Sequence, residues 1–154
     1  NIKYSILTNA LMFKEFHQQV PYVINNLEEL GVSIDGASKQ TYEKLRLGGR
    51  WDKINENLKC ISELRQKHNF RFVLHFVVQR DNYHEMEDII LLGKKYNADR
   101  VWLNRITDWQ TYDNFAQHDV VASAHPDHDS FQEAFAKIKT DDHFVGYPTL
   151  DRLF

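Results

Sequence analysis

Strand-like and helix-like segments alternate along about the first 105 residues, and this alternation constrains the fold more than any other feature of the sequence. Short apolar runs rich in β-branched and aromatic residues predict strands. Longer segments whose apolar residues recur every three or four positions predict helices. Such alternation is typical of right-handed crossover units, which place parallel strands in one sheet with helices outside it. The expected fold class is therefore α/β with a parallel sheet.

Four segments are predicted to be strands, at residues 2–7, at the end of 27–34, at 70–78 and at 100–106. The predicted helices lie between them, at 11–25, 40–45, 51–68 and about 82–96. Pro21 makes the second half of the first helix doubtful, because proline breaks the helical hydrogen-bond ladder. Ser38 is a plausible N-cap for the second helix, and Asp81 or Asn82 for the fourth.

The pattern changes beyond Thr107, where a polar and aromatic stretch without a clear period begins. We expect a partial barrel over residues 1–107 and a connector over 108–154 with one helix, at 129–139, and an extended tail. The first residues already read as a strand, which suggests a piece cut from a larger protein at its N-terminus.

Composition and charge exclude several classes of protein. The net charge of −3 argues against broad nucleic-acid binding, which depends on clustered Lys and Arg. No apolar run approaches the ~20 residues of a membrane-spanning helix, and no secretory signal opens the chain. Cys60 is the only cysteine, which excludes an internal disulfide and suits a reducing, cytoplasmic environment.

Polar residues directly follow each predicted strand. In parallel β/α folds, ligands bind at the carboxyl ends of the strands. Any one polar strand end is explained by the start of a loop, but four in succession favour a pocket. The polar residues at these strand ends are Asn9, Ser33, Asp35, Gln79, Asn104 and Arg105. Because strand residues alternate between faces, only one of Asn104 and Arg105 is expected to point inward.

An ordered series of short motifs carries a family resemblance over residues 2–107. The motifs are Thr8-Asn9-Ala10, Ser33-Ile34-Asp35-Gly36-Ala37-Ser38, Thr41–Arg46 with Gly48-Gly49, Asn55–Leu58, Phe76–Gln79 with Asn82, and Asp99–Trp102. In this order they resemble the third to sixth strands of radical S-adenosylmethionine (SAM) enzymes, most closely those of the SPASM type. The resemblance implies part of a (β/α)6 partial TIM barrel, truncated at its N-terminus.

The resemblance also implies roles for individual residues. Ser33 and Arg46 correspond to positions that bind SAM, and a guanidinium suits the methionyl carboxylate because it donates two parallel hydrogen bonds. The resemblance places Asp35 and Asn9 at the same open end of the barrel, in positions that contact the ribose of SAM or the substrate. Simple turn-forming roles explain these two residues equally well. Deeper in the barrel, the implied substrate-binding residues are Gln79, Asn104 and Arg105.

The implied activity is that of an iron–sulfur oxidoreductase. In this family a 4Fe–4S cluster reductively cleaves SAM, and the resulting 5′-deoxyadenosyl radical abstracts a hydrogen from a small-molecule or peptide substrate. The electron comes from a donor such as flavodoxin or ferredoxin. The CxxxCxxC cluster motif is missing from residues 1–154, and one cysteine cannot hold a cluster. The chain alone is therefore expected to be inactive and to hold no metal.

Other interpretations remain open. The main rival is a non-catalytic α/β binding or interaction module. An aldolase-like domain is disfavoured because no lysine ends a strand. The His/Asp-rich stretch at 118–143 could bind zinc, but its spacing favours a solvated connector. Ala10 stands where the family usually has glycine, so the backbone is expected to differ locally at a position that tolerates φ > 0.

An exposed sheet edge is a further expectation. A barrel cut before its third strand leaves backbone N–H and C=O groups of the first strand unpaired, and such edges recruit other chains. We therefore expect the chain either to self-associate or to fold its tail, residues 144–154, against the opening. The apolar material for this comes from Ile2, Ile6, Phe72, Leu74 and Phe76, and the sequence leaves open which of them face the barrel interior.

Overall fold

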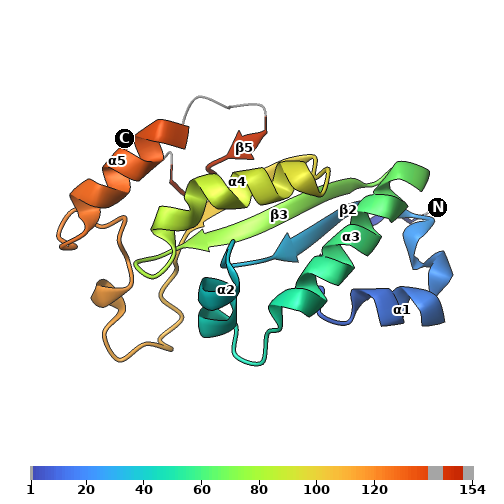
Figure 1. The fold of residues 1–154 in the computed structure, drawn as a ribbon, viewed down its shortest axis with the longest axis horizontal. Helices are drawn as coiled ribbons and strands as arrows, with labels where there is room; N and C mark the ends of the chain where they lie inside the picture. The colour runs from blue at the N-terminus through green and yellow to red at the C-terminus, as the bar shows by residue number, and fades with distance from the viewer. Residues whose placement is uncertain (1, 139–143, 151–154) are drawn as a thin grey trace.

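A computed structural model describes residues 2–138 and 144–150, which form one parallel sheet with helices packed on it (Figure 1). The five strands lie side by side in sequence order. Every neighbouring pair is parallel, so the predicted α/β class is confirmed. The strands are β1 (Tyr4–Thr8), β2 (Leu27–Ser33), β3 (Arg71–Val78), β4 (Arg100–Arg105) and β5 (Val145–Gly146).

The helices α2, α3 and α4 cover the same side of the sheet, and α5 packs beside α4 (Figure 1). The α-helices are α1 (Phe13–Gln19), α2 (Lys39–Leu45), α3 (Trp51–Lys67), α4 (Met86–Lys95) and α5 (His128–Ile138). Three short 3-10 helices complete the described elements: η1 (Pro21–Ile24), η2 (Tyr83–Glu85) and η3 (Phe115–Gln117).

Two local predictions from the sequence have opposite outcomes. Ser38 caps α2 as predicted, since its side chain accepts a hydrogen bond from the backbone N–H of Thr41. Asn82 precedes η2 but makes no side-chain cap hydrogen bond, so the predicted cap of the fourth helix is wrong. Its side chain is turned back toward the strand ends, where it accepts a hydrogen bond from the backbone N–H of Gln79 at 2.8 Å.

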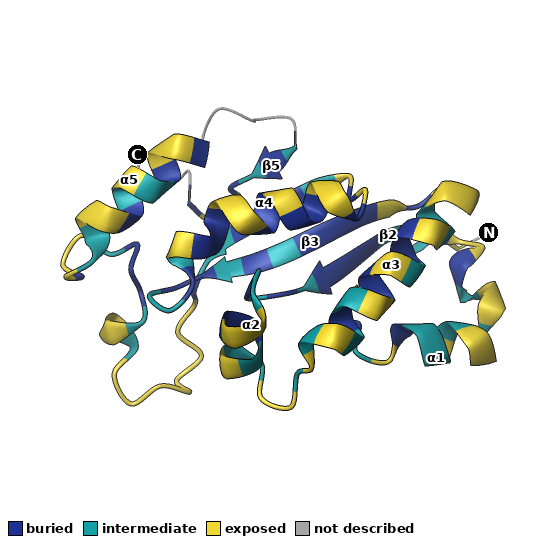
Figure 2. Ribbon diagram, viewed as in Figure 1, coloured by how far each residue is buried: buried dark blue, intermediate teal, exposed yellow. Residues whose placement is uncertain are grey.

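The two faces of the sheet differ sharply in character. Alternate residues of β3 (Phe72, Leu74, Phe76 and Val78) are fully buried in the main core. Figure 2 shows much of β3 coloured as buried, behind the helices. The sequence left open which apolar residues face the barrel interior, and the structure turns Phe72, Leu74 and Phe76 toward the helices instead. They lie on the helix side because that side offers α3 and α4 as packing partners.

The opposite face, which we call the open face, carries both polar and apolar side chains. Residues paired in register on it include Ser33, His75 and Trp102, and one step higher Val77 and Asn104. The large apolar side chain exposed on this face is Leu7, at 65%. Ser33, His75 and Asn104 are only partly buried, so the open face offers polar groups for contact between apolar ones.

The tail extends the sheet at one edge. Val145 and Gly146 pair with Val101 and Trp102 of β4, at the edge opposite β1. Residues 144–150 of the tail therefore do not cover the β1 edge, where the opening was expected. Residues 151–154 lie outside the described part of the chain. Among the described residues, β1 pairs only with β2 and keeps one free edge.

Within residues 2–138 and 144–150, no helix has the length and apolar character needed to span a membrane.

Candidate functional site

The loop that leaves β2 brings its polar residues close to the start of α2. Gly36 allows this close approach, because a Cβ at this position would lie 2.4 Å from the backbone nitrogen of Tyr42. No side chain fits at that distance from a backbone atom. The glycine therefore holds Asp35, just before it, against the helix that ends at Arg46.

Asp35 and Arg46 form an ion pair at this strand end. Arg46 Nη2 lies 2.7 Å from Asp35 Oδ2, and the two side chains are 27% and 13% exposed. Asp35 Oδ1 accepts a hydrogen bond from the backbone N–H of Val77, at 3.0 Å. The carboxylate is thereby fixed to β3 while it holds the guanidinium.

The ion pair leaves one hydrogen-bond donor of Arg46 unused. Burial raises the pKa of Asp35, and the charge of Arg46 and the N–H of Val77 oppose that rise only in part. The Nε atom of Arg46 is buried without a hydrogen-bond partner. A buried N–H that lacks an acceptor costs free energy, which an incoming carboxylate would recover.

Glu85, which the sequence did not single out, fixes the whole loop. Its carboxylate accepts hydrogen bonds at 2.6 Å from the backbone N–H of Ala37 and from the hydroxyls of Ser38 and Thr41. Burial alone would raise the pKa of Glu85, but the hydrogen bonds from Ser38, Thr41 and Ala37 hold it below its ordinary value. The only sequence signal for this role is an acidic residue directly before the apolar start of α4.

Asn82 is the second anchor that sequence reasoning did not assign to the site. The side chain is fully buried and donates to the backbone carbonyls of Asp35, at 3.0 Å, and Val77, at 2.9 Å. It thereby ties the end of β2 to the end of β3. The sequence motif identified Asn82 as part of a turn, but not as the link between two strands.

The remaining candidate residues divide into two groups. Ser33 and Asn104 lie on the open face, in register with His75 and Val77 respectively. Asn9 is exposed and accepts a hydrogen bond from the backbone N–H of Leu11, which fits the turn-forming role.

Gln79 is buried at 6% exposure, and its backbone N–H is held by Asn82. Arg105 lies on the helix side in register with Val78. There it makes a two-point ion pair with the buried Asp119, with Nε–Oδ1 at 2.9 Å. Only Asn104 of the last pair shares the open face, as strand alternation requires.

Ala10 adopts a positive φ of 55°, so the backbone keeps the conformation that glycine would favour. Alanine accepts this at a cost of roughly 1–2 kcal/mol.

Two histidines of the connector make local contacts, whereas the Nδ1 atom of a third, His118, is buried without a hydrogen-bond partner. His125 Nε2 lies 3.1 Å from the carbonyl oxygen of Gln117, and His128 Nδ1 lies 3.3 Å from that of Val120. Within residues 2–138 and 144–150, no group of three or more His, Cys, Asp or Glu residues is arranged to hold a metal ion. Several residues of the His/Asp-rich stretch, including His143, lie outside those ranges.

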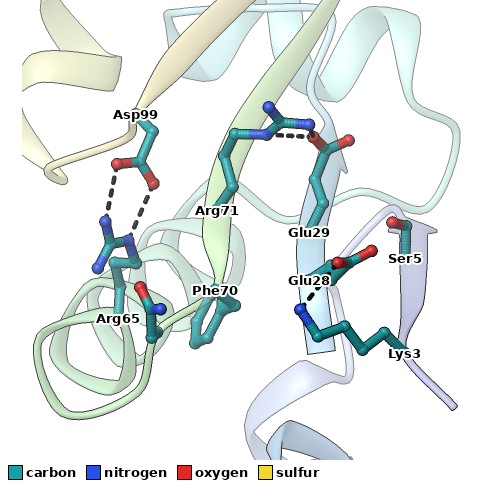
Figure 3. Close-up of a pocket in the computed structure, with 9 residues that line it drawn as sticks. Lys3, Ser5, Glu28, Glu29, Arg65, Phe70, Arg71 and Asp99 are labelled. Carbon is teal, nitrogen blue, oxygen red and sulfur yellow. Dashed lines mark hydrogen bonds and ion pairs between the residues drawn. The ribbon is translucent and has the colours of Figure 1, made fainter. Parts of the chain in front are cut away.

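A cavity of about 500 Å³ lies at the other end of the strands (Figure 3). Three cations on its wall are each paired with a carboxylate: Lys3 with Glu28, Arg65 with Asp99, and Arg71 with Glu29. Their charges are compensated within the wall, so the cavity offers no concentrated charge to a ligand. The amino ends of barrel strands generally serve stability, so we place the candidate site at Asp35 and Arg46.

Comparison with known proteins gives a clear result for the fold. No protein-family model matches the sequence, and no curated protein matches it. Among solved structures, SuiB of Streptococcus suis bound to S-adenosylmethionine superposes with a TM-score of 0.60 at 14% identity. A domain of pyruvate-formate lyase-activating enzyme from Bacteroides vulgatus gives 0.61 at 11%, and TYW1 with a lysine-pyruvate adduct bound gives 0.52 at 15%.

The superpositions cover different shares of the compared chains. The superposition on SuiB covers 95% of this chain but 31% of SuiB, and that on TYW1 covers 72% of this chain and 34% of TYW1. The pyruvate-formate lyase-activating enzyme domain is matched over 81% of its length. These likenesses establish the shared fold of a partial β/α barrel.

Proposed function

We propose that this chain is the SAM-binding part of a radical SAM enzyme, with Arg46 as the residue that holds the methionyl carboxylate. The observation that carries the proposal is the guanidinium of Arg46 at the carboxyl end of β2, with one buried N–H lacking a partner. The ordered motifs of residues 2–107 and a structural neighbour solved with SAM support the same ligand.

Each neighbouring residue has a distinct part in this proposal. Asp35 orients Arg46 through the 2.7 Å ion pair, and leaves the Nε side of the guanidinium for the ligand. Glu85 keeps the loop rigid, so that Ser33 and Arg46 stand at a fixed separation. Preorganised groups of this kind bind without paying for their own ordering.

The cluster requires residues that this chain does not offer. Cys60 lies on α3, is partly buried, and has its pKa raised mainly by that burial. A lone thiol cannot hold a 4Fe–4S cluster, so we derive no redox step from these residues. We propose that a SPASM-type parent protein supplies the cluster and receives its electron from a flavodoxin or ferredoxin. That parent would abstract hydrogen from a small-molecule or peptide substrate.

Calorimetric titration of SAM into the full chain tests the proposal. Arg46→Gln removes the cation and is expected to weaken SAM binding about tenfold or more, since charge-assisted hydrogen bonds are worth about 1.5–3 kcal/mol. Arg50→Gln, at an exposed position just before α3, is the matched control and should change affinity less than twofold.

The competing interpretation gives a different outcome. A non-catalytic interaction module with the same fold would not bind SAM, or would bind it equally well with and without Arg46. Either result contradicts the proposed function.

A further inference from the structure

The central strand β3 places His75 on the open face, next to the candidate site. Its neighbours Leu74 and Phe76 point into the core, so the imidazole faces the opposite way. His75 pairs in register with Ser33 on one side and with Trp102 on the other. It therefore lies in the middle of the face that a barrel encloses.

The sequence makes room for this ring at a glycine. A Cβ at Gly31 would lie 2.9 Å from His75 Nε2 and 2.9 Å from Leu7 Cδ1. Any larger residue at position 31 would therefore displace the ring or the leucine. The imidazole lies over β2 instead of standing away from the sheet, which leaves its nitrogens near the surface of the open face.

Among the described residues, none forms a hydrogen bond with the ring nitrogens of His75, although the side chain is half-buried. Burial lowers the pKa of His75, and the charge of Glu29 opposes this only in part. Glu29 is paired with Arg71. A neutral imidazole offers one donor and one acceptor.

His75 lies further from the carboxyl end of β3 than the Asp35–Arg46 pair does. Asp35 is bonded to the backbone of Val77, two residues further along β3. Two residues of a strand span about 7 Å. A group that contacts His75 therefore lies one layer below the Asp35–Arg46 pair, inside the enclosed face.

We propose that His75 is a substrate-binding residue that hydrogen-bonds a neutral polar group, such as an amide, of the molecule that the barrel encloses. This inference rests on the proposed function, because it takes the cofactor to be held at Arg46 and the substrate beneath it. An amide carries one donor and one acceptor, so it can bond either ring nitrogen of a neutral imidazole.

Nuclear magnetic resonance of the full chain labelled with ¹⁵N-histidine tests this assignment. The probe is 2-pyridone, which is flat and neutral and carries an adjacent N–H and C=O; benzene is the apolar control probe. The ring signals of His75 are identified by their loss in His75→Gln. We expect 2-pyridone to shift these signals saturably, with SAM absent or present, and benzene to leave them unchanged.

Variants show whether the ring nitrogens are responsible. His75→Phe keeps an aromatic ring without nitrogens and should raise the Kd of 2-pyridone about two- to tenfold, the value of a neutral hydrogen bond. His84→Phe, at an exposed histidine, is the control and should leave that Kd unchanged. Circular dichroism checks that both variants fold.

The outcomes separate this inference from the proposed function. If 2-pyridone leaves His75 unaffected, or if SAM alone shifts its signals and blocks the probe, the substrate assignment is overturned. Failure of SAM to bind in the calorimetric titration overturns the proposed function instead, whatever 2-pyridone does.

Discussion

Replacing Glu85 with glutamine tests the anchor that holds the candidate site in place. The carboxylate accepts hydrogen bonds from Ala37, Ser38 and Thr41 and is 6% exposed. Glutamine keeps the size but turns one acceptor into a donor that faces donors. Hydrogen bonds to a buried charged group are worth about 1.5–3 kcal/mol each and do not add fully.

We expect Glu85→Gln to lower the free energy of unfolding by about 3 kcal/mol. For a domain of this size, that corresponds to a fall in Tm of roughly 6–12 °C. Urea denaturation followed by circular dichroism measures the loss. Glu87→Gln, at an exposed position in the first turn of α4, should cost less than about 0.5 kcal/mol.

The pH dependence gives an independent check on the same prediction. Because the folded-state pKa of Glu85 lies below its ordinary value of 4.5, its contribution is present above pH 4.5. That contribution is lost as the pH falls through the folded-state pKa. The difference between wild type and Glu85→Gln should therefore be full at pH 7 and shrink in acid. Equal stability of the two proteins at pH 7, or a difference that grows in acid, would refute the reasoning.

Three further predictions concern the rest of the fold. Gly36→Ala should lower the free energy of unfolding by about 3 kcal/mol, because the new Cβ would clash with the backbone of α2. Gly48→Ala, in open space at positive φ, should lower it by only about 1 kcal/mol through backbone strain. Thermal denaturation compares the two variants. Asp119→Asn should cost about 2–3 kcal/mol in urea denaturation, because it breaks the two-point pair with Arg105. The free edge of β1 predicts that the chain self-associates, and Leu7→Lys should weaken the association. Light scattering across a dilution series measures it, and a strictly monomeric wild type would contradict the prediction.

The sequence predicted the sheet well because its strands carry strong local signals. Residues 70–78 are apolar, β-branched and aromatic, and β3 occupies 71–78. Pro21 similarly marked the break that separates α1 from η1. The pairing of β5 with β4 was missed, because a two-residue strand has no pattern of its own and depends on a partner distant in sequence.

The site was predictable only where a residue's role is local. Ser38 acts on its own helix, and the capping prediction is confirmed. Glu85 and Asn82 act on residues 35–41, more than 40 positions earlier in the chain, and no spacing rule connects them. Which face His75 occupies also depends on register across strands, which single-sequence patterns do not fix.

Binding of SAM compared with decarboxylated SAM tests the central claim most directly. The two molecules differ at the carboxylate that Arg46 is proposed to hold, so the comparison isolates that contact within the wild-type protein. The account predicts that the full chain binds SAM about tenfold or more tightly than decarboxylated SAM, and that Arg46→Gln binds both alike. Equal affinity of the wild-type chain for the two molecules would contradict it.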